Sequence, residues 1–260
     1  MNFWFDTHCH PHYSPLIEDI EAILHRAAEA NVLGMVCVST NFSDSEAIIP
    51  IMHLQSPIKV FRSIGVHPLS ATKYTLSELV QGLESSNMDG VVAIGETGLD
   101  DFRDPLTLDQ IPAFEAHIRF AEAHNLPIIM HSRGGENSVV EKEAKALIRD
   151  SSVKGIAHCF GGSEEFCEFL LEKGWYISFS GNITYKKSEE LREIARKVPL
   201  NRILVETDAP FLPPQGQRGK PNEPAYVTHV GRTLAEIRVM DVEELMSITM
   251  ENAKCIFNLT

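Results

Sequence analysis

The sequence has no apolar stretch of about 20 residues, the length that a membrane-spanning helix needs. Its N-terminus also lacks the basic flank and apolar run of a secretory signal, so we expect a cytoplasmic protein with no membrane partner. The five cysteines include no CxxC pair, and an odd number cannot all pair within one chain. We expect reduced thiols. Cys9 and Cys159 each neighbour a histidine, but strand alternation turns them away from it, which favours packing over metal binding.

Positive charge is also scarce, with 23 lysines and arginines against 36 aspartates and glutamates and a formal net charge of -13. Because lysine and arginine contacts to phosphate dominate binding to long nucleic acids, this balance argues against wrapping a nucleic acid, although not against gripping a strand end. No Gly/Ser linker, low-complexity tract or short repeat divides the chain. Residues 1–260 are therefore expected to form one domain, and no obligate protein partner is evident.

What the chain does have is a regular alternation of short β-branched runs with longer amphipathic stretches. The runs predict strands at residues 3–8, 34–40, 59–67, 91–96, 127–131, 154–158, 175–181 and 202–208. Helical patterns between them include residues 17–30, 106–124, 138–148, 164–172 and 188–197. Nearly continuous apolar strands that are each followed by a helix are typical of a parallel sheet covered by helices. Eight such units in a chain of this length predict an α/β fold, a single-domain (β/α)8 TIM barrel.

One long irregular stretch interrupts this alternation. Residues 209–224 read APFLPPQGQRGKPNEP, with five prolines and two glycines, which predicts an extended loop rather than a helix. A loop of this length inside a compact domain is often functional.

Residues that bind metals or move protons stand where the predicted strands end. They are His8, His10, His67, Glu96, His131, His158, Glu206 and Asp208. In a barrel all of these strand ends meet at one rim, where catalytic groups sit. His8 and His10 are two residues apart and so point to the same side of a strand. The pattern therefore predicts one shared metal site rather than isolated polar residues.

The residue types indicate which metals and how many. Neutral imidazoles together with carboxylates suit Zn, Mn, Fe and related divalent ions. Five histidines and two or three carboxylates exceed the three protein ligands of a single catalytic zinc, so we expect two divalent ions. Glu96 is a candidate to bridge them, and Asp208, directly before Ala209-Pro210, is a candidate metal ligand and proton acceptor.

Four residues near this site keep two interpretations each. His67 would either contact substrate or cap the loop after the third strand. Asp6 would be a further ligand or an anchor for neighbouring backbone. Asp100 would stabilise its loop or lie near substrate, and Glu206, one step deeper than Asp208, would support a ligand or a basic residue rather than bind metal itself. The remaining histidines, on predicted helices or loops, are expected to be satisfied or solvated: His12, His25, His53, His117, His124 and His229.

Seven segments in this order resemble the TatD family of metal-dependent deoxyribonucleases, which are (β/α)8 members of the wider amidohydrolase group. They read DTHCH, GVHP, AIGETGLDD, PIIMHSR, HCFGG, YISFSG and VETDAPFLPP with RGKPNEP, and they span almost the whole chain. The resemblance implies a two-metal hydrolase that cleaves DNA phosphodiesters, often from a 3′ end. It implies His8, His10, Glu96 and Asp208 as ligands of one ion and Glu96, His131 and His158 as ligands of the other.

The same resemblance implies that His67 lies near the scissile phosphate and that Asp208 orients or deprotonates the attacking water. Two stretches depart from the family pattern. The family usually has an aromatic residue such as tyrosine directly after GLD, where this chain has Asp101-Phe102, and acidic residues after HSR, where it has Gly134-Gly135. Neither stretch contains a proposed ligand, but both lie where substrate would pass.

A DNA end or short single strand is therefore the expected substrate. Arg133, Arg218 and Lys220 are candidates to hold its phosphates, and Phe102 or Phe211 to stack on a terminal base. One alternative is an amidohydrolase-type enzyme that cleaves an amide, lactone or ester. Those enzymes often bridge their ions with a carboxylated lysine, where this chain offers Glu96. A second alternative, a noncatalytic metal-binding protein, would require a missing core ligand, and none is missing.

Overall fold

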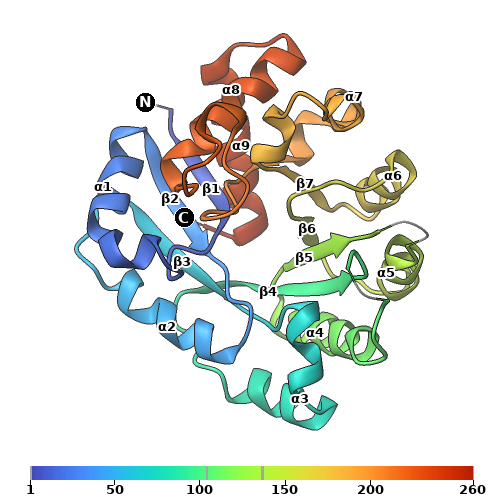
Figure 1. The fold of residues 1–260 in the computed structure, drawn as a ribbon. Helices are drawn as coiled ribbons and strands as arrows, with labels where there is room; N and C mark the ends of the chain where they lie inside the picture. The colour runs from blue at the N-terminus through green and yellow to red at the C-terminus, as the bar shows by residue number, and fades with distance from the viewer. Residues whose placement is uncertain (1, 104, 136–137, 260) are drawn as a thin grey trace.

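The structure is a computed structural model that describes residues 2–103, 105–135 and 138–259. Eight parallel strands pair in chain order, each with the next (Figure 1). Their bounds are β1 Trp4–Cys9, β2 Val32–Cys37, β3 Lys59–Ile64, β4 Val91–Asp100, β5 Ile128–Arg133, β6 Gly155–Ala157, β7 Tyr176–Phe179 and β8 Ile203–Val205. Strand β8 returns to β1, which confirms the predicted (β/α)8 barrel.

The barrel closes just beyond the ends of β1 and β8. Cys9 and Ala209 form a parallel bridge. The Asp208 amide donates to the His8 carbonyl at 2.9 Å, and the His10 amide donates to the Ala209 carbonyl at 2.6 Å. These bonds join the first and last candidate metal-binding segments of the chain through their backbones.

Helices form a ring around the strands (Figure 1). They are α1 Ile20–Glu29, α2 Phe42–Met52, α3 Leu76–Ser85, α4 Gln110–His124, α5 Val140–Arg149, α6 Glu164–Glu172, α7 Glu189–Lys197, α8 Val227–Arg238 and α9 Val242–Phe257. Large apolar side chains fill the layer between strands and helices, among them Trp4, Phe114, Phe166 and Trp175, each at most 2% exposed. In the part of the chain that the structure describes, no helix has both the length and the apolar character needed to cross a bilayer.

Several boundaries differ from the sequence prediction for local reasons. Strand β4 continues past Glu96 to Asp100 and pairs with β5 after an irregularity between Ile94 and Thr97. Helix α4 begins at Gln110 rather than at residue 106, because the Gln110 amide group bonds the Asp100 backbone on both sides and fixes where the helix starts. Helix α5 runs Val140–Arg149 instead of 138–148, and the first helix opens with a 3-10 turn, Leu16–Asp19.

The loop of residues 209–224 is irregular, as predicted, apart from the short turn η5, Gln215–Gln217, and the start of η6, Pro224–Tyr226. The buried Asn222 amide donates to the carbonyls of Thr207 and Phe211, each at 2.7 Å. These bonds hold the loop against the end of β8.

Candidate metal centre

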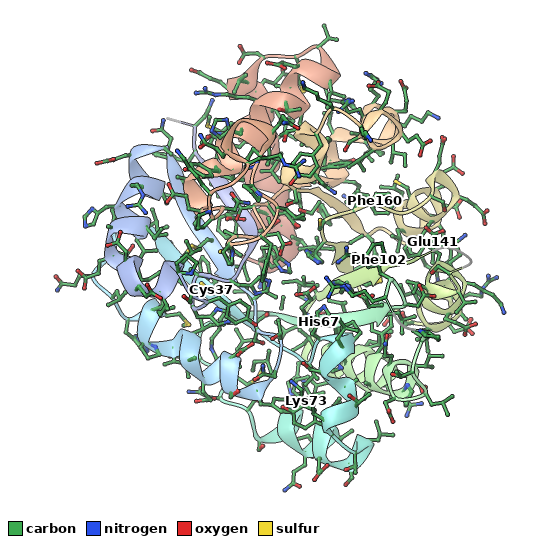
Figure 2. The ribbon with its side chains drawn as sticks, in the orientation of Figure 1. Cys37, His67, Lys73, Phe102, Glu141 and Phe160 are labelled. Carbon is green, nitrogen blue, oxygen red and sulfur yellow. The ribbon has the colours of Figure 1, made fainter. Side chains whose placement is uncertain are left out.

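The ends of the strands surround a cavity of about 960 Å³. Its lining includes His10, Glu96, His131, His158 and Asp208, which lie on or shortly after five different strands. His67 also lines it, inside the ring of helices (Figure 2). Side chains that are up to 200 positions apart in the chain therefore meet in one place, as the strand-end pattern predicts.

Four donor atoms converge at the deep end of this cavity. His8 Nε2 lies 3.1 Å from His10 Nε2, 3.5 Å from Glu96 Oε2 and 3.7 Å from Asp208 Oδ1. His10 Nε2 lies 3.7 Å from Glu96 Oε2 and 3.5 Å from Asp208 Oδ1. In a tetrahedral site with bonds of about 2.1 Å, donor atoms lie about 3.4 Å apart. The four side chains therefore fit one divalent ion.

A second group of donors meets the other oxygen of Glu96. Its Oε1 lies 2.7 Å from His131 Nδ1 and 3.0 Å from His158 Nε2. The two oxygens of one carboxylate thus face two groups of histidines, which is the arrangement that a ligand bridging two ions requires. Glu96 and the imidazoles of His8 and His158 are almost completely buried, and the latter two rings stack with centroids 3.9 Å apart.

Glu96 occupies this position because β4 bends where it passes β5. Gly98 has φ +139, and a Cβ there would lie 2.0 Å from the His131 carbonyl oxygen. Only glycine allows this close approach together with that backbone conformation. The glycines of the GETG segment therefore shape the strand that carries the candidate bridging carboxylate.

Groups behind the donors set the orientation of the imidazoles. His10 Nδ1 donates to the Val38 carbonyl at 2.7 Å, which leaves Nε2 free as a ligand. Glu206 Oε1 lies 3.1 Å from His158 Nδ1 and accepts from the Cys159 amide at 2.8 Å. Glu206 Oε2 and His8 Nδ1 are both buried without a partner. Glu206 therefore supports His158, in agreement with one of its two predicted roles.

The histidines keep the two carboxylates ionised despite burial. Burial by itself would raise the pKa of Glu96. The nearby charges of His158 and His67 and the hydrogen bonds from His131 and His158 have the larger effect, so the pKa lies well below its usual value. For Asp208 burial is likewise outweighed by the hydrogen bond from His10 and the charges of His158 and His8, and its pKa is lowered. Burial lowers the pKa of His8, which favours the neutral imidazole that a metal needs.

His67 and Asp100 each fill the structural one of their two predicted roles and also lie beside the candidate metal ligands, while their predicted roles toward substrate stay predictions. His67 Nδ1 accepts from the Leu69 amide at 3.1 Å and so caps the following turn, while its Nε2 lies 3.6 Å from Glu96 Oε1. Because Nδ1 accepts, Nε2 carries the proton and faces the cavity. Asp100 Oδ2 lies 2.8 Å from His131 Nε2, and Oδ1 accepts from the Phe102 amide at 2.9 Å. One donor atom from each of His67, Asp100 and His131 lies within 4.8 Å of the others.

Asp6 is an anchor in the structure. Its carboxylate accepts from the Thr207 amide at 2.9 Å and the Thr207 hydroxyl at 2.6 Å, so it ties β1 to the segment before Asp208. Burial raises the pKa of Asp6 to about 8. His12 differs from expectation, because both of its ring nitrogens are buried without a hydrogen-bond partner and its Nε2 lies 3.9 Å from Asp44 Oδ2.

The outer histidines follow the sequence interpretation. His117 is fully buried with both nitrogens bonded, Nδ1 to the Ala113 carbonyl and Nε2 to the Val66 amide. His25, His53 and His124 are exposed, and His229 is half-buried against Tyr226.

The candidate substrate contacts fall into two groups. Arg133, Phe102 and Phe211 line the cavity. Arg218 does not; its guanidinium lies 4.9 Å from the ring centre of Tyr185, and Lys220 is exposed outside the lining.

Sequence reasoning missed several lining residues that carry no charge or were expected only to pack: Tyr13, Thr40, Cys159 and Asn182. Cys159 has φ +43, which departs from the strand alternation used to turn it away. No pattern in the sequence marks that departure. Cys9, in contrast, is fully buried and contacts the Val36 carbonyl at 3.5 Å, as expected for a packing residue.

Comparison with known proteins agrees with this centre. The family model for TatD related DNase matches residues 5–258. The chain belongs to the TatD family of metal-dependent hydrolases. It is 38% identical to the uncharacterised metal-dependent hydrolase YabD of Bacillus subtilis, over 98% of this chain and 99% of the relative. It is 34% identical to a protein of Erwinia tasmaniensis named 3′-5′ ssDNA/RNA exonuclease TatD, over 93% of this chain and 95% of the relative.

Solved structures of TatD proteins share the whole architecture. The crystal structure of YjjV, a TatD homologue from Escherichia coli K12, superposes with a TM-score of 0.85 at 30% identity, covering 99% of this chain and 98% of that one. Family membership and the buried histidine and glutamate clusters together identify a metal-dependent hydrolase whose donor groups suit a binuclear site.

Proposed function

We propose that the protein is a deoxyribonuclease that hydrolyses DNA phosphodiester bonds from a 3′ end with two divalent ions. The observation that carries this proposal is the position of Glu96, whose Oε2 faces His8 and His10 while its Oε1 faces His131 and His158. A carboxylate with one oxygen facing each histidine group would be shared by two ions, and two-metal phosphoryl transfer uses such a pair.

The donor sets divide between the two sites. His8, His10, Glu96 and Asp208 would hold one ion, and Glu96, His131 and His158 the other; Zn, Mg, Mn or a similar ion would fit. When bound, such a pair lowers the pKa of water and neutralises charge that builds up on phosphate oxygens. The protein supplies buried, oriented donors for both ions, and this explains how an acidic chain can receive a polyanion.

The remaining steps belong to side chains. Asp208 is the most exposed carboxylate of the centre, with 13% of its side chain accessible, and it would orient the attacking water and accept its proton. His67 presents its Nε2 proton to the cavity next to Glu96, where it would donate to a nonbridging oxygen of the scissile phosphate.

The cavity supports a strand end as the substrate. It is open to solvent on one side of the barrel, and its lining includes Arg103 and Arg133, which would contact phosphates. Arg218 would contact the strand farther out. The Erwinia relative named as a single-strand exonuclease agrees with this substrate class.

Five free cysteines agree with a reducing, cytoplasmic setting.

The alternative, hydrolysis of an amide, lactone or ester by the same ions, receives less support. No lysine is found among the described residues that line the cavity, so Glu96 and not a carboxylated lysine would bridge the ions. Turnover of short single-stranded DNA compared with a panel of cyclic amides and esters separates the two reactions.

The decisive experiment uses end-labelled single-stranded DNA with a free or a blocked 3′ end. The metal-loaded protein should shorten the free strand stepwise and leave the blocked strand intact, and Glu96→Ala should abolish hydrolysis. Arg119→Gln, a change on the outer face of α4, is the control that should retain activity. Full hydrolysis by Glu96→Ala would overturn the proposal.

A further inference from the structure

The two stretches that depart from the family pattern meet at the mouth of the cavity. Asp101 Oδ1 accepts from the Gly135 amide at 3.0 Å, and its Oδ2 accepts from the Val139 amide at 3.1 Å. A Cβ at Gly135 would lie 3.1 Å from the Phe102 carbonyl oxygen, so a larger residue would press on the Phe102 backbone. The aspartate therefore binds the backbone of Gly135 and Val139, and the missing side chain of Gly135 lets that backbone lie close to Phe102.

The side chains of Phe102 and Arg133 lie against each other at the mouth of the cavity. The Arg133 guanidinium lies over the Phe102 ring, 4.0 Å from its centre. Phe102 is 49% exposed, Arg133 is exposed, and both line the cavity. Figure 2 shows Phe102 beside the ends of β4 and β5, inside the ring of helices. We call Asp101, Phe102, Arg133 and Gly135 the Phe102 platform.

The platform is connected to the metal centre by one carboxylate. Asp100 Oδ1 accepts from the Phe102 amide, and Asp100 Oδ2 lies 2.8 Å from His131 Nε2. In addition, the Asp101 amide donates to the Arg133 carbonyl at 3.0 Å. The Phe102 platform is thus fixed relative to the imidazole of His131, which faces the candidate bridging carboxylate of Glu96.

We propose that the Phe102 platform determines specificity by stacking an unpaired base of the strand end, so that the enzyme accepts single strands and rejects paired ends. This inference rests on the proposed function and deepens it. A guanidinium over an aromatic ring offers a planar cation on which the face of a free base can stack. A base in a duplex is instead held by its pairing partner and stacked on its neighbour, so it is not free to turn onto the platform.

The second aromatic residue at the mouth fits this role less well. Phe211 is 50% exposed, but it meets His10 and Tyr13 edge-on, with ring centres 6.0 and 6.3 Å apart. No arginine lies over its ring among the described residues. Phe211 therefore packs around a metal-binding histidine instead of presenting a charged plane.

The test measures binding and turnover separately in the metal-loaded protein. Binding is followed by fluorescence anisotropy with a labelled, hydrolysis-resistant phosphorothioate oligothymidylate and with a matched blunt duplex. Turnover is followed with single-stranded DNA and with methyl p-nitrophenyl phosphate, a phosphodiester without a base. The variants are Phe102→Leu and Arg133→Gln, with Phe102→Tyr as the conservative rescue. Leu76→Ala and Arg119→Gln are matched controls that remove an exposed apolar or cationic side chain on α3 and α4.

Phe102→Leu and Arg133→Gln should each weaken single-strand binding at least about fivefold, the loss expected for one stacked base. In Phe102→Leu, duplex binding and kcat/KM for the baseless phosphodiester should stay unchanged, and Phe102→Tyr should retain wild-type single-strand binding. Equal single-strand affinity in Phe102→Leu and Leu76→Ala, or an equal loss for duplex, would overturn the platform. Failure of the proposed function is seen separately, as a wild-type protein that hydrolyses neither phosphodiester.

Discussion

His117 should make the fold sensitive to mild acid through a histidine that lies outside the metal centre. It is completely buried in α4, and burial lowers its pKa from 6.5 to about 4. The neutral ring is required because Nδ1 donates to the Ala113 carbonyl while Nε2 accepts from the Val66 amide at 3.0 Å. Val66 directly precedes His67, so this bond also fixes the backbone of a candidate substrate contact.

The size of the effect follows from proton linkage. The unfolded chain takes up the His117 proton near pH 6.5, but the folded chain does so only near pH 4, so the unfolded state binds more protons in between. The stability that the neutral ring contributes is therefore present above pH 6.5 and is lost as the pH falls toward 4. Between about pH 7 and about pH 5 the loss is about 2 kcal/mol in the free energy of unfolding.

Urea denaturation at both pH values measures this loss. The wild-type protein and the control His25→Gln, which changes an exposed histidine on α1, should both lose the full amount. His117→Gln carries no titrating ring, so its loss between the two pH values should be smaller by about 2 kcal/mol. An identical loss in wild type and His117→Gln would refute the reasoning that this histidine stays neutral in the fold.

Three further predictions concern the supports of the centre. Glu206→Gln should weaken metal affinity about 10- to 100-fold because it removes the charged partner of His158, and a chelating dye in competition measures this; unchanged affinity would contradict the assigned support role. Asp6→Ala should cost about 1 to 3 kcal/mol in unfolding free energy, since the buried Thr207 amide loses its acceptor; a variant as stable as wild type would show that the anchor is dispensable. Removing metal with a chelator should lower the melting temperature, and refilling should restore it, because ions that bind only the folded state stabilise it.

The strand ends could be read from the sequence because a parallel barrel brings them to one rim. Apolar runs of β-branched residues predicted all eight strands. The polar residue at the end of a run was taken as a candidate site residue, and this rule found His131, His158 and Asp208. The sequence did not show that each oxygen of Glu96 faces a different group of histidines. This arrangement depends on the bend of β4 around Gly95 and Gly98.

Long-range partners were the part that sequence patterns could not supply. Asp6 bonds Thr207, and Asp101 bonds Gly135, and neither pairing leaves a periodic or spacing signal in the chain. The start of α4 at Gln110 has the same origin, since a side-chain bond to Asp100 decides it and not the helical pattern. His12 has no hydrogen-bonding partner on its buried nitrogens, a state that no rule for loop histidines would predict.

Metal content per chain tests the central claim most directly, namely that side chains from β1, β4, β5, β6 and the end of β8 cage a pair of cations. After loading and removal of free metal, elemental analysis of the wild-type protein should give about two divalent ions per chain. His131→Ala should retain about one, and Glu96→Ala should hold fewer than the wild type. A wild-type protein that binds no more than one ion at saturation, or a Glu96→Ala protein that still holds two, would contradict the account.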